Sequence, residues 1–405
     1  MSSRERVWAA LNHEQPDRTP IDLGGSIVTG INAMAYGALR RHLNLPAAPT
    51  APAGPVRVSN VVLLLAEVEP ELLERWGVDV LPVPRLEAAG ATPERGRRIA
   101  HPLPDGQGAS FPPGFAPALR EDGTWELREG EVVKHTLSPG SGSFVPAHFP
   151  LAGADLEAIE AYPLPGIGDR ELEVLHRTAR GLYENTDKAL FGWFGGSIFE
   201  QSQFLCGWDT FLMLLYSQPE LAEALLERLT QRILADLEPY LQAVGPYLQV
   251  IGFADDLGIQ GGLQVSPELF RRRLKPRLAR IYAAAHGTCN AKVFLHSCGS
   301  VYDLIEDLIE IGVDILNPVQ TAAANMEPER LKGEFGGRIA FWGGGAEVQG
   351  VLSRGSPEEV RRDVRRRLEV FGSGGGYVFA PIHNLQADIP PENIAAMYDE
   401  ALRSG

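Results

Sequence analysis

The stretch Lys292-Val293-Phe294-Leu295-His296-Ser297-Cys298-Gly299-Ser300 places a histidine and a cysteine two residues apart at the end of a short apolar run. The run predicts a buried strand, and a glycine and a serine end it before a predicted helix over residues 301–311. Side chains two residues apart in an extended chain point to the same face. His296 and Cys298 can therefore direct a nitrogen and a sulfur at one point beyond the strand, a donor pair that indicates zinc.

Helices and short apolar strands alternate along the chain, above all in its C-terminal two thirds. Apolar residues at helical spacing predict helices over residues 3–12, 34–43, 171–186, 199–216, 220–244, 267–286, 301–311, 328–333, 356–371 and 391–403, and residues 56–76 are predicted to be mainly helical. Short apolar runs predict strands over residues 19–25, 77–83, 189–194, 247–253, 292–295, 314–317, 338–342 and 376–380. Such alternation indicates a parallel sheet covered by helices.

About eight strand and helix units favour a closed α/β structure, a (β/α)8 TIM barrel, over an open doubly wound sheet. No Gly-x-Gly-x-x-Gly turn follows the first strand, which weakens the dinucleotide-binding alternative. Residues 88–150 depart from the alternation because proline, glycine and charged residues interrupt them. Within them, residues 124–127 and 132–135 flank a polar turn and predict a β-hairpin. We expect an irregular insertion into a single barrel domain that spans residues 1–405.

The composition is that of an ordinary globular protein, with 44% hydrophobic and 22% charged residues among 405. A net charge of −15 argues against nucleic acid or an anionic membrane surface as a partner. The three cysteines are too few for a disulfide framework and fit a reducing cytoplasm. The N-terminus lacks the apolar core of a signal peptide, and no apolar run is long enough to span a bilayer.

Polar side chains follow the predicted strands at the end where barrels of this class carry their chemistry. Asp255 and Asp256 follow one strand, and since adjacent residues alternate faces, one of them should point into the mouth. There it could hold a substrate cation, act as a general base or orient a ligand histidine, or it could simply cap a turn or helix. Glu200 opens a helix, where an acidic residue is favoured in any case. We expect catalytic groups at Asp255, Asp256 and Glu200, and substrate-binding groups at Asp22, Trp193, Gln201, Asn317, Gln320 and Asn384.

A zinc site needs a third protein ligand. His383 follows the last predicted strand, so a closed barrel places it on the same rim as His296, unless it only caps or packs. Cys289 lies at the opposite end of the strand that carries His296, and Cys206 lies among apolar residues of a helix, so we expect both to be small buried residues. The predicted metal ligands are therefore His296, Cys298 and His383.

These features resemble the uroporphyrinogen decarboxylase superfamily, in particular its zinc-dependent, corrinoid-linked methyltransferases. The resemblance covers most of the chain and implies a (β/α)8 barrel with zinc on His296 and Cys298, which match the His-x-Cys of that branch. The motifs that carry it are Arg4-Glu5-Arg6-Val7-Trp8-Ala9-Ala10-Leu11, Pro16-Asp17-Arg18-Thr19-Pro20, Asp255-Asp256-Leu257-Gly258, His296-Ser297-Cys298-Gly299-Ser300, Gly312-Val313-Asp314-Ile315-Leu316-Asn317-Pro318-Val319-Gln320 and Pro390-Pro391-Glu392-Asn393-Ile394.

Two departures from the family pattern bear on the reaction. The later ligand of the methyltransferase branch is a cysteine, whereas this chain has His383, and a His2Cys set would leave zinc a stronger Lewis acid, suited to activating an ether, an amine or a bound water. Porphyrinogen decarboxylases carry a Met-Arg-Gln-Ala-Gly-Arg-Tyr segment whose arginines hold substrate carboxylates, but residues 23–30 here contain no arginine. A mouth lined by acids and amides would repel a polycarboxylate, so we do not expect decarboxylation of uroporphyrinogen.

The resemblance thus implies a zinc-dependent methyltransferase that moves a methyl group between a small substrate and the cobalt of a corrinoid (cobalamin). No part of the chain looks like a corrinoid-binding module, so the corrinoid would be carried by a partner protein, and a homodimer is common in the superfamily. Two rival hypotheses stay open at this point. One is a decarboxylase or other lyase on the same barrel, possibly without metal, and the other is a non-catalytic binding protein that kept the barrel.

Overall fold

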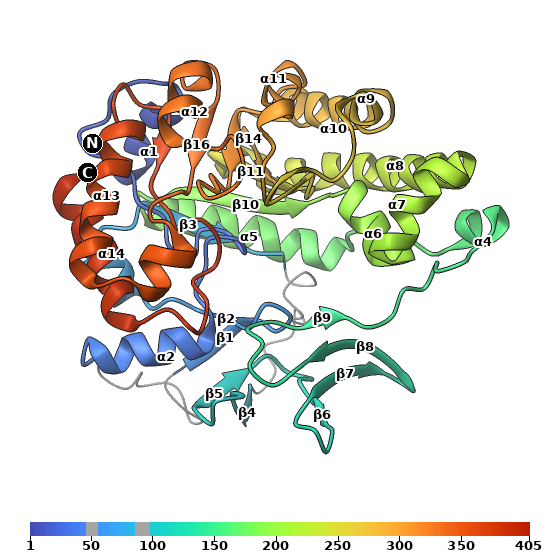
Figure 1. Ribbon diagram of the computed structural model, residues 1–405, viewed down its shortest axis with the longest axis horizontal. Helices are drawn as coiled ribbons and strands as arrows, with labels where there is room; N and C mark the ends of the chain where they lie inside the picture. The colour runs from blue at the N-terminus through green and yellow to red at the C-terminus, as the bar shows by residue number, and fades with distance from the viewer. Residues whose placement is uncertain (46–55, 86–97) are drawn as a thin grey trace.

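A curved wall of parallel strands forms the centre of the molecule (Figure 1). The computed structural model describes residues 1–45, 56–85 and 98–405. Seven strands pair in parallel, and their order is β17 (Tyr377–Val378), β16 (Ala340–Trp342), β15 (Ile315–Asn317), β14 (Lys292–His296), β11 (Val250–Ala254), β10 (Ala189–Gly195) and β3 (Val80–Val83). The fold is an α/β TIM barrel, as the alternation of helices and strands predicts.

The predicted strand over residues 19–25 completes the wall as its eighth member, but it pairs over only a few residues. Ile21 forms a parallel bridge with Phe379, and the backbone N–H of Asp22 donates to the Phe379 carbonyl over 2.8 Å. On the other side, the Asp79 N–H donates to the Ile21 carbonyl over 2.8 Å, just before β3. Residues 20–22 therefore close the gap between β17 and β3. The extended segment stays short because Pro20 lacks an N–H and a glycine pair follows it.

Alternate residues of the strands point into the barrel and fill it with side chains, as the two-residue period of a strand requires. They form one buried cluster with Val7 and Leu11 of α1 (Ser3–Leu11), which covers the N-terminal end of the wall. The aromatic members meet edge to face, with ring centroids of Phe294 and Trp342 5.7 Å apart. The strand members of this cluster are Val80, Ala189, Phe191, Trp193, Val250, Phe294, Ile315, Ala340, Trp342 and Val378.

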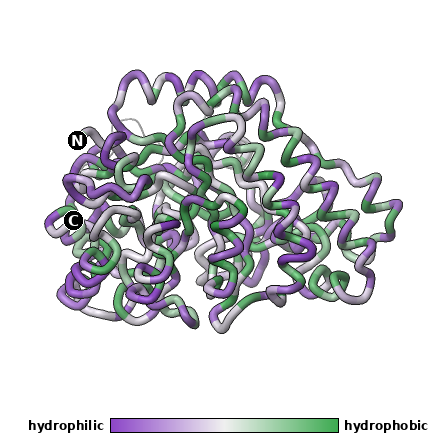
Figure 2. Tube along the Cα trace, turned by 90° about the horizontal axis from the view of Figure 1, so that it is seen from above, coloured by the Kyte–Doolittle hydropathy of each residue, from purple (hydrophilic) through white to green (hydrophobic). Residues whose placement is uncertain are grey.

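Helices cover the outer face of the wall (Figure 1). In Figure 2 hydrophobic segments gather in the middle of the molecule, while the outer helices alternate between hydrophobic and hydrophilic stretches, as amphipathic helices do. Within the described residues, no helix has both the length and the apolar content needed to cross a membrane. The helices are α2 (Ala33–His42), α3 (Pro70–Arg75), α4 (Leu156–Ala161), α5 (Asp169–Asn185), α6 (Phe199–Cys206), α7 (Trp208–Ser217), α8 (Pro219–Val244), α9 (Pro267–Leu269), α10 (Lys275–Thr288), α11 (Ile305–Glu310), α12 (Pro328–Phe335), α13 (Pro357–Phe371) and α14 (Pro391–Ser404).

Two accessory sheets lie below the barrel in Figure 1. One has the order β2 (Leu65–Ala66), β1 (Val56–Asn60), β5 (Gly108–Phe111), β4 (Ile99–Pro102), and the other has β6 (Ala118–Leu119), β7 (Trp125–Glu129), β8 (Val132–Leu137), β9 (Val145–Pro146). The predicted hairpin is confirmed, since β7 and β8 pair antiparallel with Trp125 opposite Leu137. Residues 88–97 of the predicted insertion lie outside the described part of the chain. The assignment of one domain to the whole chain stays a prediction.

Two secondary-structure predictions are wrong. Residues 56–76 are not mainly helical: Val56 and Val58 are buried while Arg57 and Ser59 are less so, and this two-residue period belongs to strand β1, with only α3 helical later on. Residues 199–216 form two helices instead of one, because Gly207 adopts φ +93 and separates α6 from α7. Such a positive φ cannot continue a right-handed helix.

Candidate metal centre

Three potential ligands converge at the C-terminal end of the barrel. The Nε2 atom of His296 lies 3.4 Å from the Sγ atom of Cys298, and the rings of His296 and His383 have centroids 5.2 Å apart. One ligand atom from each of the three residues can be chosen so that all lie within 4.8 Å of one another, and no other such group of metal-binding side chains occurs in the described parts of the chain. The residues come from the end of β14 and from the loop that follows β17.

The local fold explains why His296 and Cys298 face the same point. His296 comes two residues after the inward-facing Phe294 on the same strand, so its side chain also points into the barrel. The loop after His296 packs against the loop after β11. The Ser300 N–H donates to the Ile259 carbonyl over 2.8 Å. Gly299 has φ +82, and a Cβ there would lie 2.6 Å from the carbonyl carbon of Gly258. Only glycine permits this approach of two backbones, so the two loops hold each other in place.

The surroundings favour neutral forms of all three groups in the metal-free protein. Burial, and then the nearby His296, lowers the pKa of His383 to about 3. Burial lowers the pKa of His296 and raises the pKa of the Cys298 thiol well above its ordinary value. Neutral imidazole is the form that binds a metal, while the thiol has to release its proton on binding. The two imidazoles are therefore already in the form that binds a metal, whereas the Cys298 thiol keeps its proton in the metal-free protein.

Asp255 and Asp256 point in opposite directions. Asp255 is fully buried, and its carboxylate accepts hydrogen bonds of 2.8–3.1 Å from the backbone N–H groups of Ile198, Phe199 and Glu200. It thus caps the N-terminus of α6. Burial raises the pKa of Asp255 to about 7, although these three donors favour the charged form. The structure thus shows Asp255 as a helix cap, one of the roles that the sequence left open, and its catalytic role stays a prediction.

Asp256 is the acid that faces the candidate centre. Its Oδ1 atom accepts a hydrogen bond of 2.7 Å from the Cys298 N–H and lies 4.0 Å from Nε2 of His296. Its side chain keeps about 30% of its surface exposed. Asp256 can therefore hold the Cys298 loop with one oxygen and meet a substrate with the other.

Glu200 stands at the first turn of α6, directly above the Asp255 cap. Burial, followed by the charges of Asp256 and Asp255, raises the pKa of Glu200 to about 8. Glu200 also contributes to the raised pKa of the Cys298 thiol, after burial and Asp256. A carboxyl group that keeps its proton at neutral pH can serve as a general acid. Gln201, the next residue, is half-buried.

Of the six predicted substrate-binding residues, three are occupied by other contacts. Asp22 is fully buried and accepts hydrogen bonds from the Gly25 N–H and the Trp342 indole. Asn384 accepts from the Gly30 N–H and donates to the Ile27 carbonyl. Asn317 is fully buried, with both amide atoms bonded. Asp22, Asn384 and Asn317 are thus engaged by the protein itself, and their part in substrate binding stays a prediction.

The other predicted residues differ in how much they offer to a substrate. Trp193 is 6% exposed and packs within the barrel interior. Gln320 accepts from the Gly299 N–H over 2.8 Å and donates to Gln260, so it braces the Cys298 loop. Trp342 was not predicted from the sequence as a site residue. Its indole N–H donates to Asp22, and its carbonyl accepts from Asn317. Its signal was its position at the end of a predicted strand, in phase with the inward-facing residues.

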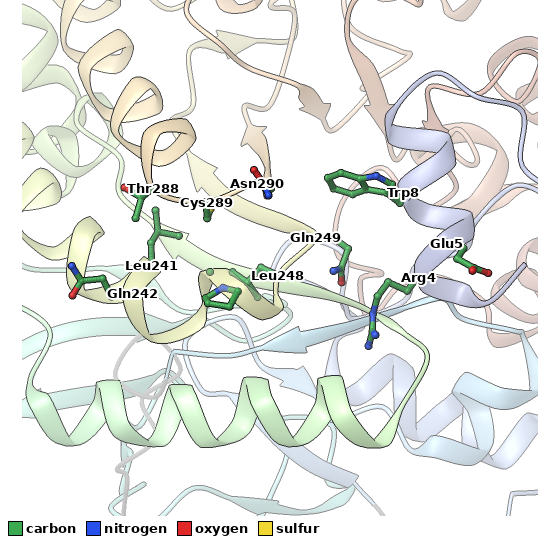
Figure 3. A pocket seen from close by; sticks show the side chains of 12 residues that line it. Arg4, Glu5, Trp8, Leu241, Gln242, Leu248, Gln249, Thr288, Cys289 and Asn290 are labelled. Carbon is green, nitrogen blue, oxygen red and sulfur yellow. The ribbon is translucent and has the colours of Figure 1, made fainter.

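A cavity of about 590 Å³ lies at the opposite end of the barrel (Figure 3). Arg4 and Trp8 of α1 line it together with Gln249 and Cys289, which precede β11 and β14. None of the rim residues takes part in it. The N-terminal end of such barrels serves stability, whereas the C-terminal end carries the chemistry, so we place the candidate site at the rim. Cys289 lies at the far end from His296 as expected, but it is half-buried and lines this cavity, so the prediction that it is buried is wrong. Cys206 is buried in the core as expected.

Residues 133–403 match the family model of uroporphyrinogen decarboxylase (URO-D). The chain belongs to the URO-D family. Curated relatives include uroporphyrinogen decarboxylases from Burkholderia mallei, 25% identical over 47% of this chain and 51% of the relative, and from Alkalilimnicola ehrlichii, 29% identical over 46% and 48%. The chain thus spans about half the length of the curated relatives it matches. The family model takes its name from an enzyme, uroporphyrinogen decarboxylase.

The URO-D barrel of this chain is also found in a solved structure, a methyltransferase from Methanosarcina mazei. The two superpose with a TM-score of 0.59 over 99% of this chain and 98% of the other, at 18% identity. At this identity the likeness is one of fold. The reaction of this URO-D family member therefore has to be argued from its own rim residues.

Proposed function

We propose that this chain is a zinc-dependent methyltransferase that moves a methyl group between a small substrate and a corrinoid carried by a partner protein. The observation that carries the proposal is the convergence of His296, Cys298 and His383 at the C-terminal end of the barrel. Two imidazoles and one thiolate form a ligand set typical of catalytic zinc, which takes three protein ligands and keeps a fourth position for a substrate.

The separations of the three groups fit a zinc ion. Bonds of about 2.0–2.3 Å in a tetrahedron put neighbouring ligand atoms about 3.3–3.8 Å apart. The distance from His296 Nε2 to Cys298 Sγ, 3.4 Å, already has this value. The widest separation of the set is no more than 4.8 Å, so closing it takes a shift of about 1 Å. A half-buried His383 side chain on a loop can make such an adjustment.

The chain's own acids supply the proton chemistry. Zinc held at this centre would supply Lewis acidity at the heteroatom that carries the methyl group. The carbon–heteroatom bond would break with its electron pair left on the heteroatom, which would take a proton from Glu200, and a Co(I) corrinoid on the partner protein would supply the electron pair for the new bond to the methyl group. In the reverse direction the Glu200 carboxylate accepts that proton. Asp256 orients the substrate beside Cys298, to whose N–H it is bonded.

Decarboxylation is the competing reaction, because the curated relatives carry that name. The structure gives little support to a polycarboxylate substrate. The loop of residues 23–30 is held at Asn384, next to His383, and it contains neither arginine nor lysine. The carboxylate of Asp256 adds negative charge at the same rim. A polycarboxylate would find no arginine or lysine in this loop and would be repelled by Asp256.

Metal analysis of the purified protein tests the proposal. We expect about one zinc per chain in the wild type and loss of zinc in Cys298→Ala and His383→Ala variants that stay folded. Cys289→Ala is the matched control, since this cysteine lies at the other end of β14 and should leave the zinc content unchanged. Methyl transfer is then followed by absorbance with free cob(I)alamin and either a methyl phenyl ether or a methylamine as donor. A folded, zinc-free wild type that decarboxylates uroporphyrinogen would overturn the proposal.

A further inference from the structure

Asn317 lies directly behind His296. The Nδ1 atom of His296 is 2.6 Å from the Oδ1 atom of Asn317, and both residues are buried. They are register partners on neighbouring strands, β14 and β15, and both side chains point into the barrel. Residues paired in this way keep their Cβ atoms close, so the contact follows from the sheet itself.

The other end of the Asn317 amide fixes which atom faces the histidine. Its Nδ2 atom donates to the Trp342 carbonyl over 2.8 Å. A carbonyl can only accept, so the amide nitrogen has to be on that side and the amide oxygen on the His296 side. Because this oxygen also only accepts, the proton of the neutral imidazole has to sit on Nδ1. The lone pair of His296 is then on Nε2, the atom 3.4 Å from Cys298 Sγ.

Trp342 is itself held firmly. Its indole N–H donates to Asp22 over 2.8 Å, and the residue is fully buried at the end of β16. The next residue, Gly343, has φ +104, and a Cβ there would come within 3.1 Å of Asn317 Nδ2. The glycine therefore leaves the amide room to reach the Trp342 carbonyl. A chain of buried hydrogen bonds runs from Asp22 through Trp342 and Asn317 to His296.

We propose that Asn317 is a positioning residue that sets the tautomer of His296 and so directs its Nε2 lone pair at the metal centre. This inference rests on the proposed function only for the identity of the metal. Metal-bound histidines commonly donate their second N–H to such a partner, and losing the partner typically weakens metal binding about 10–100-fold. A substrate-binding role does not fit, since both polar atoms of Asn317 are engaged and the residue is fully buried.

The tautomer can be measured without metal. In wild-type protein treated with a chelator and labelled with ¹⁵N-histidine, long-range proton–nitrogen correlation spectra should show His296 protonated on Nδ1 and bare on Nε2. In Asn317→Leu the ring should lose this preference. Asn317→Asp should keep it, because a neutral carboxylic acid offers a donor to Trp342 and an acceptor to His296. A wild-type ring protonated on Nε2 would overturn the inference, whatever the variants do.

Zinc affinity, measured by competition with a chelator, provides the second readout. We expect Asn317→Leu to bind zinc about 10–100-fold more weakly than the wild type and Asn317→Asp to bind within a few-fold of it. Asn317→Ala removes the same atoms without added bulk and takes the place of the leucine variant if that does not fold. Asn393→Leu is the control, because this buried asparagine bonds the Leu352 and Gly355 carbonyls in another part of the molecule.

The two proposals fail in different ways. If the wild type binds no zinc but His296 is protonated on Nδ1, the proposed function fails and the role of Asn317 stands. If the wild type binds zinc and Asn317→Leu binds it equally well with an unchanged tautomer, the role of Asn317 is refuted and the metal site stands.

Discussion

Replacing Asp255 by alanine separates a capping role from a catalytic one. The side chain is fully buried, and three backbone N–H groups at the start of α6 depend on its carboxylate. Leaving one buried N–H without a partner costs about 1–3 kcal/mol, so three amount to about 3–9 kcal/mol. Relief of the buried charge and water entering the vacated space offset part of this. We expect Asp255→Ala to lower the free energy of unfolding by about 2–4 kcal/mol.

Urea denaturation followed by circular dichroism at pH 8 measures this loss. Asp155→Ala is the matched control, since Asp155 caps α4 at an exposed position through one hydrogen bond of 2.9 Å to the Ala158 N–H. That change should cost about 0.5–1 kcal/mol. Hydrogen exchange should also quicken at residues 198–200 in Asp255→Ala. A loss below about 1 kcal/mol, combined with complete loss of methyl transfer, would refute the capping argument and return Asp255 to the reaction.

Three further predictions concern the rim. Because the pKa of Glu200 is raised to about 8 in the folded state, its contribution to stability is fully present below about pH 4.5 and is lost as the pH rises through 8. Glu200→Gln should therefore flatten the pH dependence of unfolding in metal-free protein and be the more stable variant at pH 9, by at most about 5 kcal/mol; an unchanged pH profile would contradict this. His383→Cys should keep its zinc but slow ether or amine demethylation by about tenfold, while the cobalt-substituted protein gains thiolate absorption; faster turnover would count against the Lewis-acid argument. Gly299→Ala should destabilise the protein by about 2–4 kcal/mol and weaken zinc binding, whereas Gly261→Ala, whose Cβ meets nothing within 4 Å, should do neither.

Much of the barrel can be predicted from the sequence because the helical period of about 3.6 residues and the short apolar runs of buried strands are both visible in it. The alternation of helices and apolar strands gives the fold, and the spacing of His296 and Cys298 brings their ligand atoms together at one strand end. The strand at residues 56–60 is predicted as helix because its two-residue period is short and lies beside longer helical patterns. The break at Gly207 needed a backbone angle that no periodicity reports.

The directions of the rim residues were only partly predictable. Parity could have separated the two aspartates: Val250 faces the barrel interior while Phe253 packs outward, so Asp256 continues the inner row and Asp255 the outer one. Asn317 shows the limit of such reasoning. Its parity directs it inward, but only the pairing of β14 with β15 reveals that His296 stands in front of it and uses its oxygen.

The wall closes at Ile21 through only a few backbone hydrogen bonds, so the loop that follows is held less firmly than the strands. The seven-stranded ladder carries His296 and Cys298, whereas the loop of residues 23–30 hangs from a segment tied by two backbone hydrogen bonds on one side and one on the other. Insertions or substitutions in that loop can reshape one flank of the mouth while the ladder keeps the positions of His296 and Cys298. The same changes reach His383, because Asn384 beside it is bonded to Gly30 and Ile27, so the shape of this flank and the position of the third candidate ligand change together.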